Sequence, residues 1–213
     1  AITRRLTARQ GGVPDASLWF DDGAKLPVSL AARANAVTSD AAASDDSDLR
    51  NIVHPGTPLA AASLALAEKL GSRGEDVLAA MVLGYESQYR IGSAVTPGFT
   101  HRGFHGSIVS IFGSAAAAAR LLGLDEDGMT HAIALAATSV GGMMAAANTS
   151  VSREYHAGLA TMLGIEAALA ASEGFTGEEH IIEMPRGFIE VHGGGDAARA
   201  LGGFGESWGI LEE

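Results

Sequence analysis

The sequence has 213 residues, of which 47% are hydrophobic and 18% charged, enough for one large core or two modest ones. A net charge of −11, with only 14 Lys and Arg residues, argues against binding of nucleic acid. The lack of cysteine excludes disulfides, iron–sulfur clusters and thiolate zinc sites. The apolar stretches are too short or too mildly hydrophobic to span a bilayer, and the first residues lack signal-peptide order, so we expect a cytoplasmic protein without a membrane segment.

A small β-hairpin is predicted near the start of the chain. Residues 2–10 are a short basic stretch, and residues 15–20 and 25–28 fit two strands joined by the tight turn Asp21-Asp22-Gly23. We assign residues 1–28 to this N-terminal segment and hairpin.

The rest of the chain is expected to be helical. Apolar periodicity, with glycines at several helix ends, predicts six helices at residues 30–43, 58–70, 75–93, 107–122, 126–146 and 156–172. Thr176 and Glu179 have the Thr-x-x-Glu order of a capping box, which predicts one more short helix. The expected fold class is all-α, a compact multi-helix domain over residues 29–186, followed by a glycine-rich connector over residues 187–213.

Two stretches rich in alanine and glycine, residues 115–119 and 141–147, would permit close approach between helices. Residues 133–147 have almost no polar face, so we expect this stretch to lie centrally in the domain or at a subunit interface. This pattern predicts a homo- or hetero-oligomer.

Three motifs place a histidine or a strong cation where an alanine-rich helix is about to start: His54-Pro-Gly, Gly103-Phe-His105 and Arg153-Glu-Tyr-His156. Histidine moves protons near neutral pH, and a helix N-terminus offers free N–H groups to an anion. Each histidine alone could equally cap or pack its own helix. The three together favour a site for a carboxylate substrate.

Metal sites fit the sequence poorly. His101 and His105 have the i, i+4 spacing of helical metal ligands, but Gly103 lies between them and no carboxylate is nearby. The acidic cluster at residues 40–48 lacks the glycine and the terminal glutamate of a calcium loop. We therefore predict no metal site.

A set of ordered motifs spans nearly the whole chain and resembles the MmgE/PrpD family, also called the 2-methylcitrate dehydratase family. The motifs are Ala34-Asn-Ala36, Asp45-Asp46-Ser47, Val53-His54-Pro-Gly56, Gly84-Tyr-Glu86 with Arg90, Gly103-Phe-His105, His156-Ala-Gly158 and Gly174-Phe-Thr-Gly177. Members of this family act on small polycarboxylates without a metal or an organic cofactor, and they include dehydratases, an epimerase and a decarboxylase.

The resemblance implies a cofactor-independent enzyme that abstracts a proton next to a carboxylate of a small polycarboxylate, as in a lyase or dehydratase. An epimerase or double-bond isomerase using the same proton chemistry is the first alternative. A non-catalytic scaffold subunit is the second, and retention of both loop histidines favours an enzyme. The residues implied are His54, His105 and Asp46 for catalysis, and Ser47, Arg153, Asp45 and His156 for substrate binding.

Several positions depart from the family's pattern. Ala43 stands where the family usually has an aspartate, Asp40 where a histidine is frequent, Arg153 where a lysine is usual and Tyr155 where a leucine is usual. Arginine stays protonated and cannot act as a general base, so Arg153 would only clamp a carboxylate.

The family's polypeptide continues into a second, lid-like α+β domain, which this sequence lacks. We therefore expect a second polypeptide that carries the lid. A natural split subunit, a cleavage product and a fragment remain open alternatives.

Overall fold

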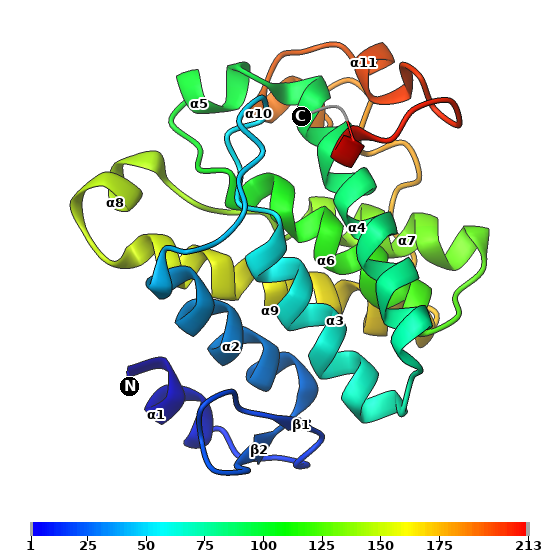
Figure 1. Ribbon diagram of the computed structural model, residues 1–213. Coiled ribbons are helices and arrows are strands. Elements are labelled where there is room, and N and C mark those ends of the chain that lie inside the picture. Colours follow the sequence, from blue (N-terminus) through cyan, green and yellow to red (C-terminus); the bar gives the residue numbers. More distant parts are fainter. Residues whose placement is uncertain (1, 212–213) are drawn as a thin grey trace.

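The computed structural model describes residues 2–211 and shows a body of α-helices with one short hairpin at its edge (Figure 1). Helix α1 (Ile2–Ala8), which the sequence did not predict, precedes strands β1 (Ala16–Ser17) and β2 (Lys25–Leu26). The two strands pair antiparallel, which confirms the predicted hairpin.

The helical body comprises, in chain order, α2 (Val28–Ala42), α3 (Gly56–Leu70), α4 (Gly74–Val95), α6 (Ser107–Leu121), α7 (Glu126–Ala137) and α9 (Ser152–Ser172). The shorter elements are α5 (Gly98–His101), α8 (Met144–Thr149), α10 (Phe188–His192), α11 (Ala198–Leu201) and the 3₁₀ turn η1 (Gly209–Leu211). This arrangement confirms the expected all-α domain with a small hairpin. No helix within residues 2–211 combines the length and the apolar character needed to cross a membrane.

Asn35 of α2 fastens the hairpin to the helical body. The backbone N–H of Trp19 donates to Asn35 Oδ1 at 2.9 Å, and Asn35 Nδ2 donates to the carbonyl oxygen of Ser17 at 3.0 Å. Because Asn35 is buried, its amide satisfies backbone groups that water cannot reach.

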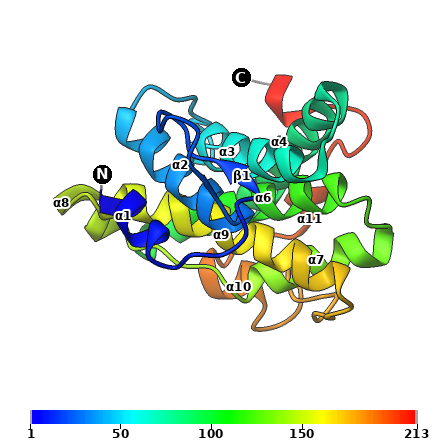
Figure 2. The ribbon, with the colours of Figure 1, turned by 90° about the horizontal axis from the view of Figure 1, so that it is seen from below.

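Helix α6 is the central helix of the body. It packs against α3, α4, α7 and α9, and its residues from Ser107 to Ala119 are all buried. Figure 2 shows α3 and α4 on one side of α6, with α7 and α9 on the other. Small residues permit this close packing, since a Cβ added to Gly113 would lie 3.0 Å from the carbonyl oxygen of Gly84 in α4. The predicted close packing of residues 115–119 is confirmed.

The helix predicted over residues 126–146 is wrong in its second half. Helix α7 ends at Ala137, the chain passes through Gly141 and Gly142 as a loop, and α8 starts afresh at Met144. Gly142 has φ +137°, a conformation that side chains other than glycine rarely adopt and that no helix contains. The part of this stretch in α7 is buried, but Met143 is 60% exposed, so the second half does not lie centrally in the domain; a subunit interface there stays a prediction.

The short helix predicted from the capping-box motif at Thr176 is also wrong. The chain instead turns back on itself, and the N–H groups of Phe188 and Ile189 donate to the carbonyls of Ile181 and Ile182 at 2.7 and 3.0 Å. Burial of the Phe188 and Ile189 side chains in the core favours this loop over a helix.

Residues 198–211, which we call the strap, run along α4 (Figure 1). Arg90 of α4 is buried and donates hydrogen bonds to the carbonyls of Ala200, Gly202, Gly203 and Ser207. Arg90 also pairs with Glu86, whose other carboxylate oxygen accepts from the N–H of Gly209 at 2.9 Å. The strap is therefore held through its backbone by one buried ion pair.

Candidate functional site

The three histidine motifs meet at one end of the helical body. Residues 103–105 pair with residues 142–144, because His105 N–H donates to the Gly142 carbonyl at 3.1 Å and Met144 N–H donates to the Gly103 carbonyl at 2.9 Å. This pairing brings the start of α9 beside the start of α6, and the rings of His105 and His156 lie 5.5 Å apart between centroids.

A small cavity of about 20 Å³ lies where these segments converge, and His54, His105, Asp40 and Ser107 contribute to its lining. This volume is enough for about one water molecule. The structure therefore brings together the two histidines that the sequence singled out as catalytic.

Hydrogen bonding fixes the tautomer of His54. Its Nδ1 lies 3.1 Å from the backbone carbonyl oxygen of Asp46, which can only accept, so Nδ1 carries the proton. Ser47 Oγ lies 3.2 Å and Asp45 Oδ1 lies 3.5 Å from the same nitrogen. Nε2 of the neutral ring therefore holds a free lone pair, and the side chain is 39% exposed.

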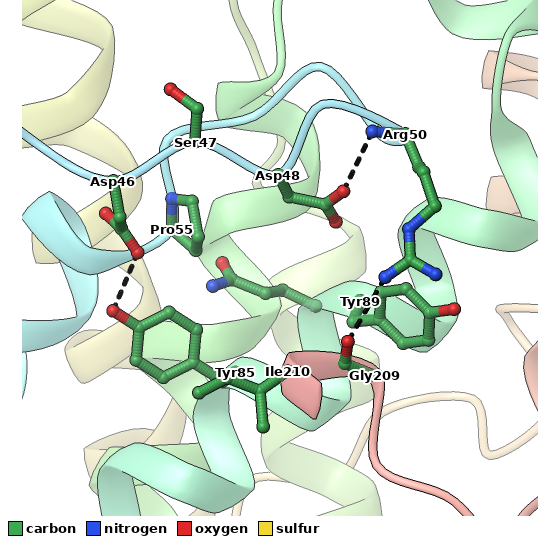
Figure 3. Close-up of a pocket in the computed structure, with 10 residues that line it drawn as sticks. Asp46, Ser47, Asp48, Arg50, Pro55, Tyr85, Tyr89, Gly209 and Ile210 are labelled. Carbon is green, nitrogen blue, oxygen red and sulfur yellow. Dashed lines mark hydrogen bonds between the residues drawn. The ribbon is translucent and has the colours of Figure 1, made fainter. Parts of the chain in front are cut away.

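The two aspartates of the acidic pair point to different partners. Asp45 faces His54 and accepts a hydrogen bond from Thr57 Oγ1 at 2.9 Å. The Asp46 carboxylate instead accepts from the N–H of Gly56 at 2.9 Å and from the Tyr85 hydroxyl at 2.8 Å (Figure 3). Asp46 thus anchors the His-Pro-Gly loop to α3 and α4, and only its backbone carbonyl contacts His54.

Asp46 and Tyr85 also line a pocket of about 300 Å³ beside this loop. Figure 3 shows the Asp46 side chain turned towards Tyr85, whereas Ser47 points away from the pocket. Burial, with the neighbouring Asp46 carboxylate, raises the pKa of Tyr85, so its hydroxyl stays protonated and donates to Asp46. This pocket could not be predicted from sequence patterns, because its walls come from the loop, from α4 and from the strap.

His105 has the opposite hydrogen-bonding arrangement to His54. The backbone N–H of Ser107 donates to His105 Nδ1 at 3.3 Å, so Nδ1 accepts and the proton of the neutral ring lies on Nε2. Burial, followed by the positive charges of neighbouring groups, lowers the pKa of His105 to about 4. At neutral pH His105 is therefore a neutral ring that can donate from Nε2.

His156 lies in the second turn of α9, behind His105. Burial lowers its pKa, an effect that the nearby Asp40 carboxylate opposes. Its Nδ1 is buried and has no hydrogen-bond partner within residues 2–211. In the same part of the chain, no group of three His, Asp or Glu side chains is arranged to hold a metal ion.

Arg153 is engaged by a residue that the sequence did not assign to the site. Its Nε donates to Asp40 Oδ2 at 3.1 Å, and its Nη2 donates to the Asp40 backbone carbonyl at 3.0 Å. Positions 40 and 153, both expected to depart from the pattern of the family that the sequence resembles, therefore contact each other. Sequence reasoning missed the pair because its members are 113 residues apart.

Comparison with known proteins places this geometry in a family. Residues 1–200 match the MmgE/PrpD N-terminal domain. The cis-aconitate decarboxylase of Homo sapiens is 33% identical over 178 residues, which cover 81% of this chain and 37% of that protein. The cis-aconitate decarboxylase of Aspergillus terreus is 29% identical over 181 residues, 82% of this chain and 37% of that protein.

The enzyme of the same name from Mus musculus is 31% identical over 178 residues, 81% of this chain and 36% of that protein. The chain thus spans little more than a third of the length of these relatives. It belongs to the MmgE/PrpD family, and the part present here corresponds to that family's N-terminal domain.

Proposed function

We propose that this chain carries the two proton-transferring histidines of a lyase that acts on a small polycarboxylate such as cis-aconitate. The supporting observation is that His54 and His105 line one cavity in opposite tautomers. The His54 ring can then accept a proton at Nε2, and the His105 ring can donate a hydrogen bond from Nε2. Proton transfer at a carbon beside a carboxylate needs both a base and a donor.

In this proposal His54 exchanges the proton at the reacting carbon. Its Nε2 accepts a proton when the ring acts as a base, and the resulting imidazolium returns a proton to carbon when it acts as an acid. Asp45 and Ser47, which face Nδ1, orient the ring, and the Asp45 carboxylate faces the charge that the ring gains.

His105 takes the electrostatic role. Because it is neutral, it does not protonate the substrate carboxylate, and its Nε2–H donates to the carboxylate oxygen on which negative charge develops. In decarboxylation His54 starts as the imidazolium, with a proton taken from solvent. The carbon–carboxylate bond breaks, carbon dioxide leaves, and the electron pair left on the substrate takes up the His54 proton to form a C–H bond. In dehydration neutral His54 first takes the proton from carbon, the C–O bond then breaks, and the hydroxide takes the proton from the His54 imidazolium and leaves as water.

The test is turnover of cis-aconitate in deuterated water, with release of carbon dioxide and the position of the solvent label both measured. We expect carbon dioxide and one deuterium bound to carbon in the product. His54→Ala and His105→Ala should each lower turnover by about 10²-fold or more, while His180→Ala, at an exposed histidine paired with Glu183, should not. If both site variants turned over cis-aconitate as fast as the wild type, the catalytic role of the two histidines would be wrong and only the scaffold role would remain.

We also propose that polypeptide beyond residues 2–211, in this chain or in a second one, closes the site. Two observations support this. The His54 side chain is partly exposed, and the chain matches little more than a third of the length of its relatives. Native mass spectrometry of the protein from its own source would identify a second chain, and assays should then use the whole assembly.

A further inference from the structure

Asp40 and Arg153 form an ion pair where the end of α2 meets the start of α9. Arg153 is held at two points, by the Asp40 side chain and by the Asp40 backbone carbonyl. Asp40 is only 4% exposed, so its carboxylate is fixed by the surrounding core. Because a guanidinium is planar, two bonds from neighbouring nitrogens fix the direction of its remaining N–H groups.

The remaining edge of Arg153 is free. Its Nη1 makes no hydrogen bond within residues 2–211, and the side chain is 30% exposed. Asp40, which holds Arg153, lines the same cavity as His54 and His105. The positive charge of Arg153 also contributes to the lowered pKa of His105.

We propose that Asp40 is a positioning residue: it fixes Arg153 so that the free edge of the guanidinium binds one carboxylate of the substrate. The inference rests on the proposed function, and it adds a requirement for the substrate. One carboxylate binds Arg153 while another lies at the reacting carbon beside His105, so the substrate carries at least two carboxylates.

A purely structural role for the pair is the competing explanation. The Asp40 carbonyl lies in the last turn of α2, where it accepts from the Ala43 N–H at 3.1 Å as well as from Arg153, so Arg153 also helps to cap α2. A cap would affect stability and leave substrate binding unchanged. The two explanations therefore differ in KM.

The test is a double-mutant cycle in KM and kcat for cis-aconitate, using Asp40→Ala, Arg153→Ala and the double variant. We expect each single variant to raise KM about tenfold with little change in kcat, because binding is lost and proton transfer is not. The double variant should be no worse than Arg153→Ala alone. Asp15→Asn, which disrupts the distant pair with Lys69, is the matched control and should leave KM unchanged.

Additive effects in the cycle would show that Asp40 acts independently of Arg153 and would overturn the inference, as would unchanged KM in the single variants. Asp40→Asn keeps the shape and one acceptor oxygen, so it replaces Asp40→Ala if that variant does not fold, with a smaller expected rise in KM because the charge is lost and one acceptor remains.

Calorimetric titration with cis-aconitate separates this inference from the proposed function. Binding by the wild type without turnover, weakened in Asp40→Asn, supports the positioning role and overturns the proposed reaction. Turnover with an unchanged affinity in Asp40→Asn overturns only the positioning role. Absence of both binding and turnover in the wild type overturns both.

Discussion

At the scale of the residue, the two histidines proposed to transfer protons, His54 and His105, differ in what their Nδ1 atoms contact. The Nδ1 of His54 faces a carbonyl, and the Nδ1 of His105 faces an N–H. These two backbone groups decide which ring offers a lone pair and which offers a proton at Nε2. The chemistry of the site therefore depends on loop geometry as much as on the residue type.

Glutamine substitutions should separate the two roles. In His105→Gln the amide oxygen can accept from the Ser107 N–H while the amide nitrogen donates in place of Nε2, so this variant should retain more activity than His105→Ala, which we expect to lose about 10²–10³-fold in kcat. His54→Gln should lose about 10²–10⁴-fold, because an amide is not a base. Steady-state turnover of cis-aconitate measures both, and equal losses in the two glutamine variants would contradict the assigned tautomers.

The lowered pKa of His105 also has a consequence for stability. Between pH 6.5 and about 4 the unfolded chain binds a proton at His105 that the folded chain does not. The contribution of His105 to the free energy of unfolding is therefore complete above pH 6.5 and falls as the pH drops towards 4. Urea unfolding should show a steeper loss of stability with acidification in the wild type than in His105→Gln; parallel profiles would refute this.

The motifs indicated that His54 and His105 belong to one site, and the structure places both at one cavity, while their catalytic role stays a prediction. Short segments before helices carry both histidines. The motifs could not show that the Asp46 carboxylate turns towards Tyr85, or that Asp40 holds Arg153, because those contacts join segments that are far apart in the chain.

At the scale of the element, the loop between α7 and α8 determines the geometry around His105. Gly142 provides the carbonyl that accepts from the His105 N–H, and Ser107 Oγ donates to the neighbouring carbonyl of Gly141 at 3.0 Å. Helical periodicity across residues 126–146 concealed this loop, because alanines on both sides of the two glycines continue the same pattern.

Gly142→Ala should disrupt this element. A Cβ at this position, where φ is +137°, would contact Ser107 Oγ and approach His156 Nδ1 to 3.4 Å. We expect a loss of about 1–3 kcal/mol in the free energy of unfolding, together with lower activity, because Ser107 orients His105.

Gly141→Ala is the matched control for this change. A Cβ at Gly141 has no atom within 4 Å, and its φ lies outside the left-handed region, so stability and activity should remain near the wild-type values. Thermal unfolding and kcat, measured on Gly142→Ala and Gly141→Ala, test whether the effect is specific to position 142. Equal effects would show that the loop tolerates side chains generally.

At the scale of the whole molecule, the helical body follows from the sequence and the strap does not. Apolar periodicity located the body helices, apart from the second half of the one predicted over residues 126–146, because each packs apolar residues against α6 or α9. The strap has little periodicity and is held by backbone bonds to Arg90, a kind of contact that leaves no pattern in the bound segment.

Arg90→Ala should release the strap. The change removes the donors for four strap carbonyls and leaves the Glu86 carboxylate buried without its cation, which we expect to cost about 3–5 kcal/mol. Hydrogen exchange should accelerate across residues 198–211 and remain slow in α6. Arg199→Ala, which removes one exposed bond to the Thr96 carbonyl, is the control and should change little; an unchanged strap in Arg90→Ala would contradict this account.

In mechanical terms, the strap and the loop that carries His54 form one linkage. Arg50 of the loop donates to the carbonyl of Gly209 at 3.1 Å, while Glu86 of α4 holds the N–H of the same residue. Asp48 accepts from the Arg50 N–H and pairs through two backbone bonds with Val53, the residue before His54. A displacement of the strap at Gly209 would therefore pass through Arg50, Asp48 and Val53 to the backbone beside His54.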